Sequence, residues 1–292
     1  MKIRQIICFF MLIVWYAGCG GSDYEDFSGI TIATFNVQDF SGTDAYNRTA
    51  AFIKDFDVDI IFFQEIQYYD GPLLNTALAN RGVVHSYQNC FSTDANGSGE
   101  LDDNTACWSK YSIQFSEDIL RGDYVDPISL ERVNAPRYIL RVKINLDNRF
   151  IIWFYGVHLK ALHDGNSIKR RRAQAHALEE YIKNRHDTQQ EYIVILGDMN
   201  TISSSEFADN SVMGFLSMKF DNPVNTANDF MPVTVTHLGA DDWTHTTFAS
   251  RLDHLILSPA LYEKYIEGSV QVVHLPENVS DHFPVLLKIW MD

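Results

Sequence analysis

Basic residues are scarce in this chain of 292 residues. Lys and Arg together number 23, against 38 Asp and Glu, and the formal net charge is −15. A surface of this charge repels a polyanion. The balance argues against a protein that coats nucleic acid. It does not exclude a phosphate-containing substrate that reaches a single metal-loaded cleft.

Several catalytic sequence motifs are also missing. The chain contains no Walker A loop and no G-x-G-x-x-G, G-x-S-x-G or H-E-x-x-H pattern. These absences argue against nucleotide-driven motors, dinucleotide oxidoreductases, α/β-hydrolases and zincins. Apolar content is ordinary, with 46% hydrophobic and 13% aromatic residues, so the chain can bury a large core and is not mostly disordered.

The N-terminal apolar stretch, Ile6–Tyr16, is too short to span a bilayer. It follows the basic residues Lys2 and Arg4, which is typical of a signal peptide. The run YAGC that ends at Cys19 resembles the lipobox of bacterial lipoproteins. This resemblance implies cleavage after residue 18 and lipidation of Cys19. An ordinary secretory signal cut nearby is the alternative, and both predict export.

Removal of residues 1–18 lowers the net charge to −17. The small, polar residues 19–28 are typical of a flexible tether, and we expect one domain over 29–292. The expected location is the bacterial cell envelope, lipid-anchored at the outer membrane or on the periplasmic face. A secreted protein is less favoured. The lipid anchor makes the membrane a partner, and no protein partner is predicted.

Cysteine is rare, with four residues in the chain. Cys8 leaves with the signal peptide, and Cys19 would carry the lipid. Cys90 and Cys107 remain, without a C-x-x-C motif, and an oxidising compartment favours a disulfide between them. The alternative is two unlinked buried thiols.

Strand and helix signals occur along the whole of the expected domain. Two segments have the apolar period of a helix, residues 43–57 and 167–185. Apolar runs rich in β-branched and aromatic residues predict strands at 30–35, 59–64, 138–144, 150–157, 191–196, 252–257, 270–274 and 285–289. Several runs lack strict alternation, which predicts strands covered on both faces in a layered α/β or α+β domain.

Polar residues stand directly beside these predicted strands, where a rigid scaffold presents catalytic groups. They are Asn36, Glu65, His158, Asp198, Asn200, Asp253, Asp281 and His282. Carboxylate and amide oxygens are hard ligands that suit Mg²⁺ or Mn²⁺ rather than zinc. An Asp–His pair can act as a general base. The set therefore predicts metal-assisted chemistry on a phosphate group.

The ordered motifs ATFNVQ, FQE, GVHLK, GDMN, RLDH and SDHFPV resemble those of the endonuclease/exonuclease/phosphatase superfamily. That group includes secreted DNases, abasic-site endonucleases, inositol-phosphate phosphatases and neutral sphingomyelinases. The resemblance runs from about residue 30 to residue 289. It implies an α+β fold, a four-layer αββα sandwich of two mostly antiparallel sheets flanked by helices.

The resemblance also implies roles for single residues. Glu65 matches the principal metal ligand, and Asn36 and Asp281 help to hold the ion or its waters. His282 matches the catalytic histidine, which Asp253 orients. Asp198 matches the residue that positions or activates the attacking water, a role it shares with His282. The groups matched to binding of the scissile phosphate are Asn200 and His158.

Arg171 and Gln174 resemble a recurrent Arg-x-x-Gln of the family helix, so Arg171 is a candidate phosphate contact. The alternative is a solvated helix face. His254 follows Asp253 on a strand and should point to the opposite face, in a structural role. The other histidines show no partner pattern and are expected to be structural or exposed: His85, His176, His186, His237, His245 and His274.

The predicted function is an exported phosphoesterase that depends on Mg²⁺ or Mn²⁺ and hydrolyses a phosphodiester by in-line attack of water. A DNase-like nuclease is narrowly favoured. The alternative is a phosphodiesterase or phosphatase acting on phospholipids or small molecules. A catalytically inactive binding lipoprotein is more remote, because Glu65, Asp198, Asp253 and His282 are all present.

Overall fold

The computed structural model describes residues 29–41, 44–83, 87–92, 104–202, 204–220, 226–247, 249–276 and 279–291. The predicted signal peptide 1–18, the tether 19–28 and the lipidation residue Cys19 lie outside these ranges. Among the described helices, none combines the length and the apolar character needed to cross a membrane.

The first sheet has six strands in the order β13-β14-β1-β2-β4-β3. Only β1 and β2 run parallel in it, and the other neighbours are antiparallel. The strands are β1 (Ile30–Asn36), β2 (Ile60–Gln64), β3 (Gln88–Phe91), β4 (Ala106–Ser109), β13 (Gln271–Val272) and β14 (Val285–Ile289).

The second sheet also has six strands, in the order β11-β12-β10-β9-β8-β5. Here β9 and β10 form the parallel pair. The strands are β5 (Ser112–Ile119), β8 (Ile139–Leu146), β9 (Phe150–His158), β10 (Tyr192–Asp198), β11 (Met231–Pro232) and β12 (Asp253–Leu257). A separate hairpin joins β6 (Gly122–Val125) to β7 (Arg132–Ala135).

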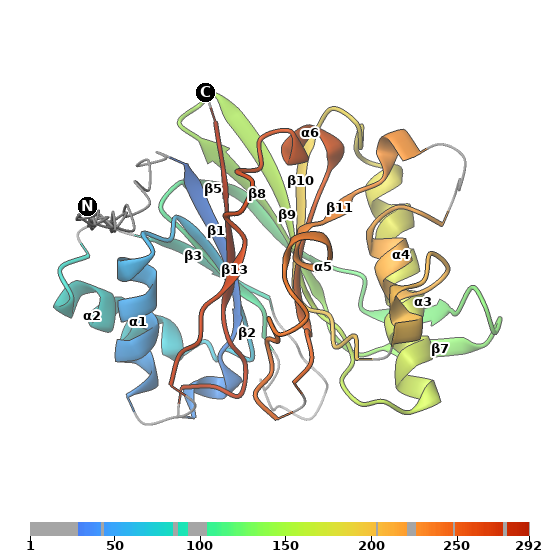
Figure 1. Cartoon of the computed structure of the whole chain (residues 1–292), viewed down its shortest axis with the longest axis horizontal. Helices are drawn as coiled ribbons and strands as arrows, with labels where there is room; N and C mark the ends of the chain where they lie inside the picture. Colours follow the sequence, from blue (N-terminus) through green and yellow to red (C-terminus); the bar gives the residue numbers. More distant parts are fainter. Residues whose placement is uncertain are drawn as a thin grey trace, which may run out of the picture.

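The two sheets pack face to face, with helices on both outer faces (Figure 1). The helices α1 (Ala45–Asp55) and α2 (Asp70–Asn80) cover the first sheet, while α3 (Gly165–Lys183) and α4 (Val212–Leu216) cover the second. Two shorter helices are α5 (Val233–His237) and α6 (Pro259–Tyr262), and 3₁₀ turns occur at Gln38–Phe40, Ser204–Phe207 and Thr226–Asn228. The predicted αββα sandwich is confirmed.

Successive aromatic residues on the central strands show why each strand is apolar throughout. Phe62 and Phe154 point between the sheets, where their rings stack with centroids 5.4 Å apart. Their neighbours Phe63 and Tyr155 point the other way, into the two outer cores beneath the helices. Because side chains alternate along a strand, a strand buried on both faces needs apolar residues at every position. The predicted burial on both faces is confirmed.

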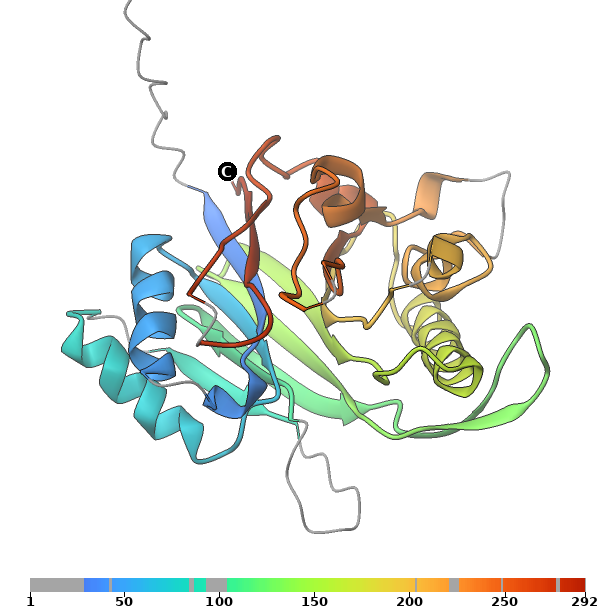
Figure 2. The same cartoon turned by 60° about the horizontal axis from the view of Figure 1, so that its bottom comes forward.

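One edge of the sandwich collects the ends of the strands that carry the motifs. The parallel strands β1 and β2 end there, and the antiparallel β14 begins there. The same holds in the second sheet for β9, β10 and β12. This edge is at the bottom of Figure 1 and comes forward in Figure 2. The topology therefore brings segments that are far apart in sequence to one place.

A candidate active site at the shared edge of the two sheets

Strand register places the motif residues side by side. Asp198, the last residue of β10, pairs with His158 at the end of β9 and with Asp253 at the start of β12. Gly197 makes the close packing of β9 and β10 feasible, because its φ is +133° and a Cβ there would lie 2.0 Å from the carbonyl oxygen of Val157. Only glycine combines this conformation with this contact.

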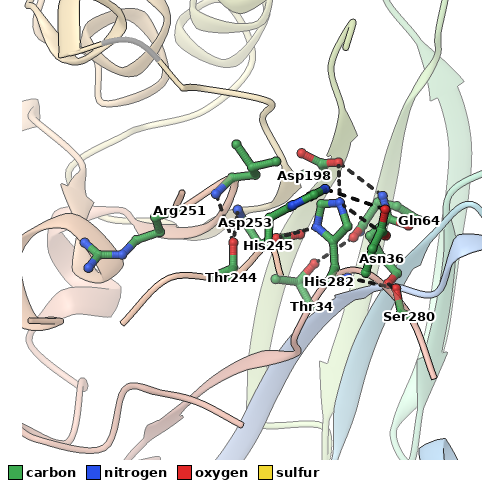
Figure 3. Close-up of polar contacts among 12 residues, drawn as sticks. Thr34, Asn36, Gln64, Asp198, Thr244, His245, Arg251, Asp253, Ser280 and His282 are labelled. Atoms are coloured by element: carbon green, nitrogen blue, oxygen red, sulfur yellow. Dashed lines mark hydrogen bonds and ion pairs between the residues drawn. The ribbon is translucent and has the colours of Figure 1, made fainter. Parts of the chain in front are cut away.

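His282 is held by Asp253 (Figure 3). The Nδ1 atom of His282 lies 2.8 Å from Oδ2 of Asp253, and both residues are buried. The Nε2 atom of His282 lies 3.8 Å from Oδ2 of Asp198 and 4.0 Å from Oδ1 of Asp281. This is the predicted Asp–His pair, and it presents Nε2 to two further carboxylates.

The carboxylates around His282 control its charge. Burial alone lowers the pKa of His282, but the charge of Asp253 and its hydrogen bond to the ring raise the pKa. The charges of Asp198 and Asp281 act in the same direction, and the pKa reaches about 10. The surrounding carboxylates therefore favour the protonated, cationic form of the ring.

Asn36 connects Glu65 and Asp198 across the two sheets. Its Nδ2 donates to Oε1 of Glu65 and to Oδ2 of Asp198, both at 3.1 Å, and its Oδ1 accepts the backbone N–H of Gln38. A backbone N–H can only donate and an ionised carboxylate can only accept, so these partners fix the orientation of the amide. In this arrangement the Asn36 nitrogen, not its oxygen, faces the two carboxylates, and the part of Asn36 in holding the ion or its waters stays a prediction.

His158 faces the same two carboxylates, and its predicted contact with the scissile phosphate stays a prediction. Its Nε2 lies 3.5 Å from Oε1 of Glu65 and 3.6 Å from Oδ2 of Asp198. Burial raises the pKa of Glu65 to about 7 despite the hydrogen bond from Asn36, and the charge of Asp198 adds to this. Burial likewise raises the pKa of Asp198 to about 6 against the opposing charge of His282. Negative charge is therefore crowded here.

Such crowding of one buried and two partly buried carboxylates fits a divalent cation, which would neutralise the charge that burial penalises. The donors available are the oxygens of Glu65, Asp198 and Asp281, which line one cavity, and these hard ligands suit Mg²⁺ or Mn²⁺. The residues present therefore fit the predicted metal.

Gln38 holds Asp281 in place at this site. Its Nε2 donates to Oδ2 of Asp281 at 3.2 Å, and its Oε1 accepts the backbone N–H of Asp281. The hydroxyl of Ser280 donates to the carbonyl oxygen of Asn36, which joins the loop before β14 to the end of β1. Two segments from opposite ends of the chain are thereby fixed together.

The cavity at this edge has a volume of about 270 Å³. Its polar lining consists of Glu65, His163, Asp198, Asn200, His245, Asp281 and His282. Its apolar lining consists of Ala161, Leu162, Ile202 and Leu252. Asn200 is fixed by its own backbone N–H, which donates to Asp198 at 2.9 Å, and by its Nδ2, which donates to the carbonyl of Leu159 at 3.0 Å.

The structure overturns the assignment of Arg171 to the substrate. Arg171 is fully buried, and its guanidinium pairs with Glu206 at 2.8 Å. It also donates to the carbonyl oxygens of Lys160 and Leu162, in the loop that contributes Leu162 to the cavity. The expected solvated face is wrong as well: α3 turns Arg171 inward, and its role is to position this loop.

The histidines divide into structural and site residues. His254 is structural, as predicted: it is fully buried, and its ring nitrogens contact the hydroxyls of Thr201 and Thr234. His245 is predicted to be structural or exposed, yet it is buried and lines the cavity. His163 lines the cavity too. No motif marked either one, because their place depends on loop packing. His85 lies outside the described residues.

Cys90 and Cys107 stand directly opposite each other on the antiparallel strands β3 and β4. Both are free thiols in the structure. Cross-strand neighbours of this kind have their Cβ atoms within reach of each other. The disulfide stays a prediction.

Sequence comparison identifies one family. The model of the Endonuclease/Exonuclease/phosphatase family matches residues 33–282. A search of curated proteins returned no match.

Solved structures with the same fold come from distant relatives. An endonuclease/exonuclease/phosphatase family protein from Leptotrichia buccalis has a TM-score of 0.65 and 18% identity, covering 90% of this chain and 100% of its own. A mannosyl-6-phosphatase from Bacteroides thetaiotaomicron has a TM-score of 0.61 and 17% identity, with coverage of 90% and 100%. An AP endonuclease from Archaeoglobus fulgidus has a TM-score of 0.59 and 17% identity, with coverage of 89% and 99%. These likenesses establish the fold.

Proposed function

Since the chain belongs to the endonuclease/exonuclease/phosphatase family, we propose that it hydrolyses a phosphodiester by in-line attack of water and depends on a divalent metal ion. One observation carries this proposal. Glu65, Asp198, Asp281 and His282 line one cavity, and a buried hydrogen bond to Asp253 orients His282 there.

The chain's own residues divide the work by their geometry. Asp253 holds the proton of His282 on Nδ1, so Nε2 is the atom at which this ring gains or loses a proton. Oδ2 of Asp198 lies 3.8 Å from that Nε2, so the two groups flank one place for the attacking water. Asn200 lines the cavity beside Asp198, where it can contact the phosphoryl oxygens. His158 also stands beside Asp198, but it is buried and is not among the described residues that line the cavity.

Glu65 and Asp281 would hold the metal, Mg²⁺ or Mn²⁺, and Asn36 would position Glu65 for this task. When bound, the ion would offset the negative charge that develops on the phosphoryl oxygens. The anionic lining then becomes compatible with an anionic substrate.

Two substrate classes remain in the proposal. Nucleic acid is the candidate that the sequence analysis narrowly favours. A phospholipid head group or small phosphoester is favoured by one structural observation: none of the described residues that line the cavity is Lys or Arg. Binding to a long nucleic acid draws on many phosphate contacts from basic side chains. A small phosphoester needs only the contacts inside the cavity.

The proposed location is outside the cytoplasm, with Cys19 lipidated and the enzyme anchored to the cell envelope. The N-terminal sequence pattern supports this proposal. An anchored enzyme would meet substrates at the membrane or in the surrounding compartment.

The test measures nicking of supercoiled plasmid and hydrolysis of bis(p-nitrophenyl) phosphate by the purified protein, with Mg²⁺ or with EDTA. His282→Ala is the test variant. His237→Ala is its matched control, because His237 hydrogen-bonds Tyr262 and is not among the residues lining the cavity. Metal-dependent activity that is lost only in His282→Ala is expected. Hydrolysis of the small diester without nicking would assign the second substrate class, and no hydrolysis of either substrate would refute the proposal.

A further inference from the structure

His245 is fixed at the active site by backbone pairing with the segment that carries the catalytic histidine. His245 and His282 form an antiparallel bridge. On either side of it, the N–H of Phe283 donates to the carbonyl of Thr244 at 2.7 Å, and the N–H of Thr246 donates to the carbonyl of Asp281 at 2.8 Å. The two imidazole rings stand edge to face with centroids 4.8 Å apart. Backbone hydrogen bonds and a ring contact therefore hold the two histidines side by side.

The tautomer of His245 follows from its contacts. The backbone N–H of Thr247 donates to Nδ1 of His245 at 3.1 Å. A backbone N–H can only donate, so Nδ1 must be the unprotonated nitrogen, and the proton of the neutral ring sits on Nε2. Nε2 lies 3.6 Å from Oδ2 of Asp281. His282 has the opposite arrangement, because its Nδ1 is paired with Asp253.

The fixed tautomer decides between two possible roles of His245, that of a metal ligand and that of a hydrogen-bond donor. Atoms of His245, Asp281 and His282 lie within 4.8 Å of one another, a spacing that could hold a metal ion. A metal ligand must offer a lone pair, however, and the lone pair of His245 is on Nδ1, where Thr247 occupies it. The Nε2 atom near Asp281 carries a hydrogen and can only donate. His245 therefore suits an anion.

The anion that this cavity must accept is a phosphoester, if the proposed function holds. Its described lining has three acidic side chains and no Lys or Arg, so donors to an anionic group come from histidine and amide nitrogens. His245 is 6% exposed, so a hydrogen bond from it would be shielded from water. Such shielding strengthens a charge-assisted hydrogen bond.

We propose that His245 is a substrate-binding residue whose Nε2–H donates a hydrogen bond to a non-bridging phosphoryl oxygen of the phosphoester. This inference rests on the proposed function. His245 and His282 then form a pair with distinct tasks. His282 can exchange a proton at Nε2, whereas His245 uses its Nε2–H as a hydrogen-bond donor to the phosphoryl group.

The experiment compares His245→Phe, which keeps an aromatic ring against His282 but has no donor, with His245→Gln, which restores an N–H donor. His237→Phe serves as the matched control for a histidine exchanged outside the cavity lining. The assay is hydrolysis of bis(p-nitrophenyl) phosphate over a range of Mg²⁺ concentrations. Calorimetric binding of inorganic phosphate to the metal-loaded protein is the second measurement, and thermal unfolding checks that each variant is folded.

We expect His245→Phe to lower kcat/KM and phosphate affinity by about 10- to 100-fold, the value of a hydrogen bond to a charged group. His245→Gln should recover part of both losses, and the Mg²⁺ requirement should not change. Unchanged kcat/KM and phosphate affinity in His245→Phe would overturn the proposal. A raised Mg²⁺ requirement with unchanged phosphate affinity would also overturn it, and would show that His245 acts through Asp281.

The two proposals fail in different ways. If the wild-type protein hydrolyses no phosphoester, the proposed function fails, and this result does not depend on any His245 variant. Phosphate binding by the wild-type protein can then still be compared with binding by His245→Phe. If the wild-type protein is active and both histidine variants match it, only the role of His245 is refuted.

Discussion

The Asp253→Asn substitution should disable His282 without removing it. The Asp253 carboxylate is fully buried and lies 2.8 Å from Nδ1 of His282, so it fixes both the tautomer and the orientation of the ring. An amide in its place can present either its oxygen or its nitrogen to the ring, so the proton need not stay on Nδ1. We expect turnover to fall by about 10²- to 10⁴-fold, the contribution of an acid–base group.

The assay is metal-dependent hydrolysis of bis(p-nitrophenyl) phosphate at saturating Mg²⁺. It compares Asp253→Asn, His282→Ala and the double variant. Because Asp253 acts through His282, the double variant should be about as active as His282→Ala alone. Asp187→Asn is the matched control, because Asp187 is exposed and precedes β10 at the opposite edge of the sheet.

Two results would refute this reasoning. One is near wild-type turnover in a folded Asp253→Asn protein, which would show that the hydrogen bond does not matter for catalysis. The other is a double variant whose loss equals the product of the two single losses. In that case the two residues would act independently, and the pairing at 2.8 Å would be structural.

Glu65→Ala should raise the Mg²⁺ concentration needed for half-maximal hydrolysis, and an unchanged metal titration would exclude Glu65 as a ligand. Arg171→Met should lower the free energy of unfolding, measured by urea denaturation, by about 3–5 kcal/mol, because the buried carboxylate of Glu206 loses its partner. The double variant Arg171→Met/Glu206→Met should recover stability, and full stability of Arg171→Met alone would contradict the pairing. Burial lowers the pKa of His254 to about 4, so the unfolded chain takes up this proton first, and stability that is complete above about pH 6.5 should fall by about 3 kcal/mol towards pH 4. His254→Gln should have a flatter pH profile in urea denaturation, and parallel profiles would argue against this linkage. Oxidised glutathione should convert Cys90 and Cys107 into a disulfide with release of reduced glutathione, whereas continued alkylation of both thiols in the folded protein would contradict this.

The motif residues illustrate how far local sequence reaches. Asp198, Asp253 and His282 each stand beside a recognisable apolar strand, and the family resemblance of their motifs implied that they meet. Their strands were predictable because apolar β-branched runs define a strand locally. Parallel strands end, and their antiparallel neighbours begin, at the same edge of a sheet. A prediction of the strand order therefore also predicts where the site lies.

Arg171 and Asn36 show what local sequence does not reach. The sequence assigned Arg171 to the substrate, but its side chain is fully buried. Arg171 turns inward because Glu206 and two backbone carbonyls supply its buried partners. Asn36 presents its nitrogen because the backbone of Gln38 takes its oxygen. Neither set of partners can be read from neighbouring residues, since hydrogen-bond direction is decided only when the segments have packed.

The sequence by itself determined the layered fold and the family, because both depend on residue type, apolar period and motif order. The pairing of Asp253 with His282 followed from the family resemblance that these motifs carry. Tertiary structure alone decided how polar side chains share their donors and acceptors across the two sheets. His245 is the sharpest case: no motif marks it, and its place depends on a backbone bridge to His282. Such pairing joins residues distant in the chain, and the partner that fixes the tautomer of His245 is a backbone amide, which every residue except proline carries.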